Sequence, residues 1–124
     1  MNVQELATLK RYGLPVKIII LDNQCLGMVR QQQELFYNNR ESEIDLSDDP
    51  DFVSLAAAFG IPGQHIDSSG QIDAAIHHCL TFDGPYLLHV KIHAADNVWP
   101  IVKPGGNNDQ MLDAAPCQQT GAHP

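Results

Sequence analysis

Residues 15–37 constrain the fold more than any other stretch, because an apolar run there leads directly into a polar loop and a helix-forming segment. Residues 16–21 are apolar apart from Lys17 and include four β-branched side chains. Pro15 precedes this run and Asp22-Asn23 follows it, which is typical of a strand buried on both faces. Such strands occur in parallel sheets that carry helices on both sides, so the run predicts an α/β fold.

A polar loop, Asp22-Asn23-Gln24, follows the predicted strand. In open α/β sheets, ligands bind at the carboxyl ends of the strands, where this loop is expected to lie. Gly27 permits a tight turn, and residues 28–37 are mostly good helix formers. The N-terminus of that helix would offer N–H groups and a positive dipole end to an anion. Asn and Asp also end strands simply because they form turns, so the residues alone leave both interpretations open.

The rest of the chain alternates between helical and strand patterns. Helices are predicted where apolar residues recur at three- and four-residue spacing, and strands where short apolar runs lie between turn signals. In chain order the predicted segments are helix 1–11, strand 16–21, helix 28–37, helix 52–59, strand 65–66, helix 72–80 and strand 86–92. This order predicts a doubly wound parallel sheet.

Capping and turn residues predict the boundaries of these elements. Asp49-Pro50-Asp51 is a strong helix start, with Asp49 as the predicted N-cap and Pro50 at the first helical position. Ser68-Ser69 is predicted to cap the next helix. Residues 38–49 are polar and carry five acidic residues, which predicts a surface loop.

The composition changes after residue 93. Pro, Gly, Asn, Asp and Gln dominate from residue 94 onward, so we expect a first part at 1–93 and a C-terminal extension at 94–124. We expect residues 99–102, Trp-Pro-Ile-Val, to pack on the body or on a partner. Residues 116–124 are expected to be disordered.

Size and charge exclude several classes of protein. The chain has 124 residues, enough for one small domain with a core. Its formal net charge of −8 argues against nucleic acid as a main partner. The longest apolar run is too short to span a bilayer, and no secretory signal is recognisable, so we expect a cytoplasmic protein without a membrane partner.

The cysteines are few, odd in number and widely spaced: Cys25, Cys79 and Cys117. Without a CxxC pair, a zinc ribbon or a disulfide scaffold is not expected, and three reduced thiols are the default interpretation. Cys79 occupies an apolar helical position and is expected in the core. Cys25 lies in the polar loop, where a reactive nucleophile is the less favoured interpretation.

The histidines invite a metal-site interpretation, which their spacing does not favour. His89 and His93 lie in or beside a predicted strand, where four residues span roughly 13 Å, too far to share one ion. His77 and His78 point to different sides of a helix. We therefore interpret all four as structural or surface residues.

The order of residues from Leu21 to Gln31, Leu-Asp-Asn-Gln-Cys-Leu-Gly-Met-Val-Arg-Gln, closely resembles the second half of a thiamine-diphosphate motif. The resemblance is to acetolactate synthase large subunits, most of all to the bacterial isozyme II type. In that family the motif opens with Gly-Asp-Gly, absent here, and closes with an Asn that Asn23 matches. The similarity continues through residues 49–52, 58–61, 83–90 and 97–100 and covers residues 1 to about 112.

The resemblance implies a partial thiamine-diphosphate-binding domain and a set of site residues. Asn23 would give a side-chain oxygen to Mg²⁺, and Cys25 would give its backbone carbonyl. An amide oxygen suits this hard cation. Leu26, Gly27 and Met28 would bind the cofactor, and Met28 would also line the substrate pocket; without the family, Met28 would be interpreted as a core filler.

The activity implied is the condensation of pyruvate, after decarboxylation, with a second 2-keto acid in branched-chain amino-acid biosynthesis. No catalytic residue is expected in this chain, because the activating Glu and the FAD domain belong to parts of the family that it lacks. We therefore expect a C-terminal fragment that is inactive alone. The full-length enzyme would be a homo-oligomer of large subunits with a small regulatory subunit.

Gln32 departs from the family, which usually carries Trp there at the pocket entrance, so the preference for the second substrate is in doubt. Two rivals remain from the sequence. One is another thiamine-diphosphate enzyme, of the glyoxylate carboligase or pyruvate oxidase type, where Asn23 would serve equally. The other is a non-catalytic, flavodoxin-like binding or interaction module.

Overall fold

The computed structural model describes residues 2–48 and 50–114 and divides them into two compact units. The first, which we call the sheet unit, holds the described residues up to Gln24 together with Leu46–Ala94. The second, the helix–hairpin unit, holds Cys25–Asp45 and the described residues from Ala95 onward. The chain therefore passes between units at the end of the predicted polar loop.

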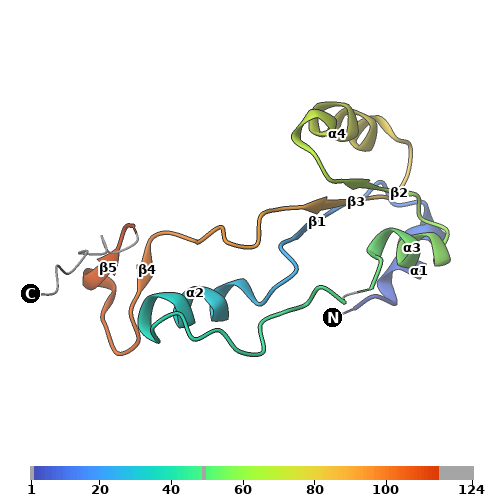
Figure 1. The fold of residues 1–124 in the computed structure, drawn as a ribbon. Coiled ribbons are helices and arrows are strands. Elements are labelled where there is room, and N and C mark those ends of the chain that lie inside the picture. Colours follow the sequence, from blue (N-terminus) through green and yellow to red (C-terminus); the bar gives the residue numbers. More distant parts are fainter. Residues whose placement is uncertain (1, 49, 115–124) are drawn as a thin grey trace, which may run out of the picture. The chain divides into compact units, whose positions relative to one another are not determined.

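The sheet unit is built on a parallel sheet, as the sequence predicts (Figure 1). Its described strands are β1 (Lys17–Asp22), β2 (Gly63–Ile66) and β3 (Tyr86–Lys91), in the order β1-β3-β2. β3 pairs in parallel with both neighbours. The doubly wound α/β prediction is confirmed, because every connection between these strands crosses over through a helix.

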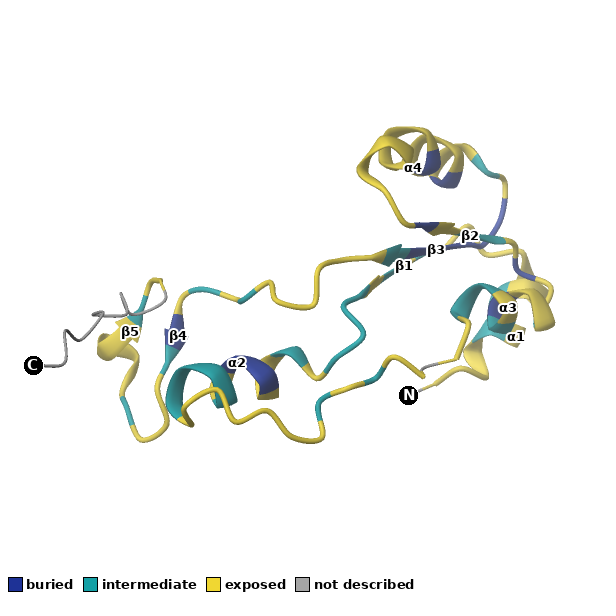
Figure 2. Ribbon diagram, viewed as in Figure 1, coloured by how far each residue is buried: buried dark blue, intermediate teal, exposed yellow. Residues whose placement is uncertain are grey.

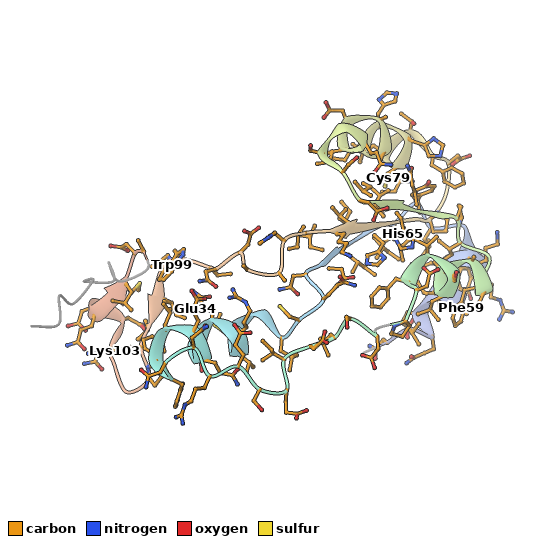
Figure 3. The ribbon with its side chains drawn as sticks, in the orientation of Figure 1. Glu34, Phe59, His65, Cys79, Trp99 and Lys103 are labelled. Carbon is orange, nitrogen blue, oxygen red and sulfur yellow. The ribbon has the colours of Figure 1, made fainter. Side chains whose placement is uncertain are left out.

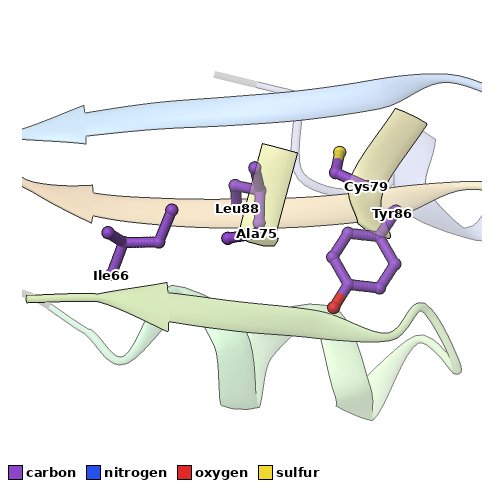
Figure 4. Packing of buried hydrophobic residues seen from close by; sticks show 5 residues of the cluster. All are labelled: Ile66, Ala75, Cys79, Tyr86 and Leu88. Atoms are coloured by element: carbon purple, nitrogen blue, oxygen red, sulfur yellow. The ribbon is translucent and has the colours of Figure 1, made fainter. Parts of the chain in front are cut away.

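Helices cover both faces of this sheet (Figure 1). α1 (Glu5–Tyr12) and α3 (Phe52–Ala58) lie on one side, and α4 (Ile72–Thr81) lies on the other. Two buried clusters hold the layers together. One comprises Ala56, Ile61 and Leu87; the other comprises Ile66, Ala75, Cys79, Tyr86 and Leu88 (Figure 4). The predicted core position of Cys79 is thereby confirmed.

β1 departs from the prediction of a strand buried on both faces. Ile18 and Ile20 pack beside the cluster under α1 and α3, but Ile19 is 55% and Leu21 65% exposed. Figure 2 colours the whole ribbon by burial. The reason is positional: β1 is an edge strand, while α4 packs over β2 and β3. An apolar run identifies a strand, but neighbouring elements decide how much of it is buried.

The N-cap of α3 lies two residues later than predicted, at Asp51 instead of Asp49. Asp51 is its N-cap, and Asp51 Oδ1 accepts hydrogen bonds from Val53 N–H at 3.0 Å and Ser54 N–H at 3.1 Å. Pro50 therefore precedes the cap instead of occupying the first helical position, and the predicted cap Asp49 lies outside the described residues. The hydrogen bonds from Ser54 are the main reason that the pKa of Asp51 lies well below its usual value.

Ser68 forms a capping box ahead of α4, but it caps a short 3₁₀ turn, and the N-cap of α4 itself is Gln71, which makes no side-chain capping bond. The Ser68 side chain accepts from the Gln71 backbone, and Gln71 Oε1 accepts from Ser68 N–H at 3.2 Å. A short 3₁₀ turn, Ser69–Gln71, separates this cap from the helix. The apolar stripe is only partly buried, because Leu80 points into solvent.

The helix–hairpin unit contains α2 (Gly27–Phe36) and a short antiparallel pair, β4 (Ile101–Val102) with β5 (Met111–Leu112). A 3₁₀ turn, Asn108–Gln110, connects these strands. The sequence did not predict this pair, because two residues per strand give no readable alternation. The loop after α2 is irregular, as predicted, apart from a bridge between Cys25 and Asp45.

Two predictions about the C-terminal part are not decided. The boundary between 1–93 and 94–124 remains a prediction. Cys117 and the expected disorder of residues 116–124 lie outside the described residues.

On the face of the sheet that α4 covers, the edge strand β1 exposes its side chains while the central strand β3 buries them, which leads to a stability prediction. Leu88 is 1% exposed in the α4 cluster, so Leu88→Ala should lower the free energy of unfolding by about 2–5 kcal/mol. Leu21→Ala, the same change on an exposed side chain, should cost less than about 1 kcal/mol. Urea unfolding followed by circular dichroism measures both values, and equal losses would contradict the burial of Leu88.

Candidate functional site

The candidate residues fall in both units and are described within each. Asn23 belongs to the sheet unit, at the carboxyl end of β1. Cys25 to Met28 and Gln32 belong to the helix–hairpin unit, at the start and on the first turns of α2. The sequence predicted both places correctly, as a strand end and a helix start.

The loop after β1 is a tight turn organised by the side chain of Asp22. Asp22 Oδ1 accepts a hydrogen bond from Gln24 N–H at 2.8 Å, and Asp22 Oδ2 lies 2.8 Å from His89 Nε2. Gln24 has φ of 53°, in the left-handed region. Burial alone would raise the pKa of Asp22, but the bonds from Gln24 and His89 bring it below its usual value. Asn23 is therefore half-buried in a turn whose flanks are hydrogen-bonded.

His89 is a structural residue, as predicted, but its role is more specific than the sequence indicated. It is buried on β3, and its ring packs against Phe52 and His65 at centroid distances of 5.3 Å and 4.6 Å. Its bond to Asp22 was not foreseen. Histidine spacing along the chain carries no information on this contact, because the two residues lie on different strands and meet only through sheet pairing.

α2 begins without a side-chain cap. Its N-cap residue is Leu26, whose apolar side chain makes no capping hydrogen bond. Leu26 N–H instead donates to Ile44 O at 2.8 Å, which anchors the helix start to the returning loop. An uncapped helix start leaves N–H groups directed outward, where an anion can accept from them. Met28 is 50% exposed on the first turn and is not a core filler in this unit.

Polar contacts that the sequence did not reveal hold α2 in place. Gln31 is 1% exposed, its Nε2 donates to Val98 O at 2.8 Å, and its Oε1 accepts from Val98 N–H at 3.1 Å. Arg30 Nη1 lies 2.9 Å from Glu34 Oε2, which also accepts from Asn97 Nδ2 at 3.0 Å.

Arg30 also donates to Asn97 Oδ1, which closes this group of contacts. Glu34 is labelled beside α2 in Figure 3. The helix that carries Met28 and Gln32 is thereby fixed to a segment more than sixty residues later in the chain. Gln32 itself is exposed.

The donor chemistry indicates what this chain can and cannot hold. Residues 2–48 and 50–114 contain no group of three or more His, Cys, Asp and Glu side chains that could bind a metal ion. The turn after β1 offers neutral oxygens, since both carboxylate oxygens of Asp22 already have partners. Neutral oxygens fit a hard cation that takes its carboxylate from elsewhere. Among the described helices, none is long and apolar enough to cross a membrane.

Comparison with known proteins gives consistent similarities. The family model described as "Thiamine pyrophosphate enzyme, C-terminal TPP binding domain" matches residues 1–90. The acetolactate synthase isozyme 2 large subunit of Escherichia coli (strain K12) is 59% identical over 113 residues, which cover 91% of this chain and 21% of that protein. The acetolactate synthase large subunit of Pyropia yezoensis is 42% identical over 120 residues, covering 96% of this chain and 20% of that protein.

A solved structure shares the fold. The thiamine diphosphate-dependent 4-hydroxybenzoylformate decarboxylase of Rhodococcus jostii RHA1 superposes with a TM-score of 0.65 and 27% identity. The superposition covers 73% of this chain and 17% of that one. This chain spans about a fifth of the length of the curated relatives it matches.

Gln31 provides a test of how α2 is held. Gln31→Leu keeps the approximate size of the side chain but leaves the N–H and C=O of Val98 without their partner, which should cost about 1–3 kcal/mol of unfolding free energy. The matched control is Gln32→Leu, the same change on the exposed neighbour, with an expected effect within about 0.5 kcal/mol. Denaturant unfolding measures both; a Gln31→Leu protein as stable as the control would rule out this role for the amide.

Proposed function

Because this chain belongs to the thiamine pyrophosphate enzymes, through their C-terminal cofactor-binding domain, we propose that it is the C-terminal part of an acetolactate synthase large subunit. The observation that carries this proposal is the 59% identity to the Escherichia coli isozyme 2 subunit, over nearly the whole chain. The reaction proposed is decarboxylation of pyruvate followed by condensation with a second 2-keto acid, in branched-chain amino-acid biosynthesis. The chain alone is not expected to catalyse it.

In this proposal the chain's own residues bind and orient the cofactor. Thiamine diphosphate, when bound with Mg²⁺, supplies the carbanion chemistry. Asn23 would give its amide oxygen to the metal, and Cys25 its backbone carbonyl. Leu26 and Gly27 would bring backbone to the diphosphate, which the uncapped start of α2 supports electrostatically. These assignments rest on the family motif, on the Asp22–Gln24 turn and on the uncapped helix, each described in its own unit.

The second substrate would meet Met28 and Gln32. The exposure of both side chains in the helix–hairpin unit supports a role in contact with a small molecule instead of a role in the core. No catalytic side chain is proposed within this chain. The parent enzyme would bind FAD in another domain, associate as a homo-oligomer with a small regulatory subunit, and work in the cytoplasm.

The rival functions are less well supported. A glyoxylate carboligase or pyruvate oxidase would use the same domain, but the 59% and 42% identities are to acetolactate synthases. The thiamine pyrophosphate family match disfavours a flavodoxin-like module.

The proposal is tested in a restored chain, in which these residues replace the matching segment of the Escherichia coli isozyme 2 large subunit. The restored chain should form acetolactate from pyruvate, with a requirement for thiamine diphosphate and Mg²⁺. Asn23→Ala removes one metal contact, so cofactor affinity measured by calorimetry should fall by about thirtyfold, or about 2 kcal/mol.

Asn107→Ala serves as the control, because Asn107 is exposed and makes no capping bond through its side chain. Its cofactor affinity should equal that of the unmutated restored chain. Unchanged affinity in Asn23→Ala would remove Asn23 from the metal site.

Gln32 leads to a separate prediction on specificity. An aromatic wall discriminates between acceptor acids better than a flexible amide, so Gln32→Trp should change the product ratio in a competition of pyruvate with 2-ketobutyrate by about fivefold, or about 1 kcal/mol. Gln110→Trp, on an exposed turn remote in sequence, is the control and should leave the ratio unchanged. Equal ratios in both variants would show that Gln32 does not contribute to acceptor choice.

A further inference from the structure

Asn23 is the central residue of a turn, and backbone hydrogen bonds hold both of its chain neighbours, Asp22 and Gln24. Ile92 N–H donates to Asp22 O at 2.9 Å, and Leu46 N–H donates to Gln24 O at 2.9 Å. Both donors belong to the sheet unit, one just after β3 and the other on the segment before α3. The backbone on each side of Asn23 is therefore tied to other segments of the sheet unit.

The backbone conformation of this turn needs a stabilising interaction, because the intrinsic preference of Gln24 does not favour it. Gln24 adopts φ of 53°, a region that residues with a Cβ atom rarely occupy. The bond from Gln24 N–H to Asp22 Oδ1 closes a ring between the two residues that flank Asn23. This is the way in which Asp side chains stabilise turns. Without it, Gln24 would lose the interaction that favours its left-handed conformation.

The other oxygen of Asp22 is fixed by a buried histidine. His89 is held between Phe52 and His65, and its Nδ1 atom is buried without a partner among the described residues. The bond from Nε2 to Asp22 Oδ2 is therefore the polar contact by which this ring meets the turn. The buried ring of His89 thus orients the carboxylate of Asp22, and this carboxylate stabilises the turn through Gln24 N–H.

We propose that Asp22, oriented by His89, is a positioning residue that presents Asn23 to a divalent cation and its diphosphate. This inference rests on the proposed function, and adds to it a residue that touches neither cofactor nor substrate. The physical reason is preorganisation: a ligand already held in its bound geometry loses less conformational freedom when the metal arrives. The carboxylate acts through Gln24 and the turn.

The chain offers a matched control for this proposal. Asp51 and His65 form a second Asp–His pair, with Oδ1 and Nε2 3.1 Å apart, and His65 is the register partner of His89 on the neighbouring strand. Asp51 of this pair caps α3. The contacts described above for Asp51 and His65 include no hydrogen bond to the Asp22–Gln24 turn. Phe at either position keeps an aromatic ring and removes one carboxylate contact, but only the contact of His89 involves the Asp22–Gln24 turn.

The test compares four variants of the restored chain: Asp22→Ala, Asp22→Asn, His89→Phe and His65→Phe. Asp22→Ala removes both contacts and should raise the dissociation constant for thiamine diphosphate with Mg²⁺ by about tenfold or more. Asp22→Asn keeps an oxygen for Gln24 N–H, so affinity should stay within about threefold. His89→Phe should weaken binding by about fivefold, whereas His65→Phe should change it by less than about twofold.

Two readouts separate positioning from a general loss of stability. Amide hydrogen exchange at Gln24, measured on cofactor-free protein, should accelerate in Asp22→Ala and His89→Phe but not in Asp22→Asn or His65→Phe. The rate of acetolactate formation at saturating cofactor should be unchanged in these variants, because the turn affects cofactor binding and not the chemical step. If Asp22→Ala unfolds, the comparison of His89→Phe with His65→Phe decides.

Equal affinities for His89→Phe and His65→Phe, or an Asp22→Ala protein that binds as tightly as the unmutated chain, would overturn the proposal and leave the proposed function intact. An unmutated restored chain that binds no thiamine diphosphate would overturn both. Affinity losses that follow the expected order, with rescue by Asp22→Asn, would support the positioning role.

Discussion

The parallel pairing of β1 with β3 is the constraint on which the sheet unit depends. It joins segments that are more than sixty residues apart, and side-chain contacts reinforce it at both ends. At the amino end, Lys17 Nζ donates to Phe82 O and Gly84 O, each at 2.6 Å. At the carboxyl end, Asp22 meets His89. The same pairing that builds the core thus also shapes the turn that carries Asn23.

The helix–hairpin unit depends on a different kind of contact. α2 is short, and Gln31 and Arg30 are its buried residues, so apolar burial alone accounts poorly for its position. The side-chain amide of Gln31 bonds both the C=O and the N–H of Val98, and the carboxylate of Glu34 accepts from Arg30 and Asn97. These hydrogen bonds specify one geometry more narrowly than apolar packing does, while Arg30 Nε is buried without a hydrogen-bond partner among the described residues. This matters for function, because α2 carries the residues proposed to meet the cofactor and the second substrate.

The proposed function also explains features that are unfavourable for a separate domain. β1 exposes Ile19 and Leu21 on one face, and α4 exposes Leu80. Exposed apolar side chains on an edge strand normally mark a surface that another element covers. The relatives are about five times longer than this chain, so the proposed parent enzyme has the additional structure with which such a surface can pack.

The sequence by itself determined the local elements, because their signals lie within a few residues of each other. The apolar run of β1, the Ser68 capping box and the strand–turn–helix order all follow from local preferences, and the motif around Asn23 identified the family. Only the tertiary structure decided the burial of β1 and the partners of Gln31. It also decided that Asp22 meets His89 across the sheet. Each of these depends on which distant segment lies alongside, and the pairing of distant segments is set by the whole fold instead of by neighbours in the chain.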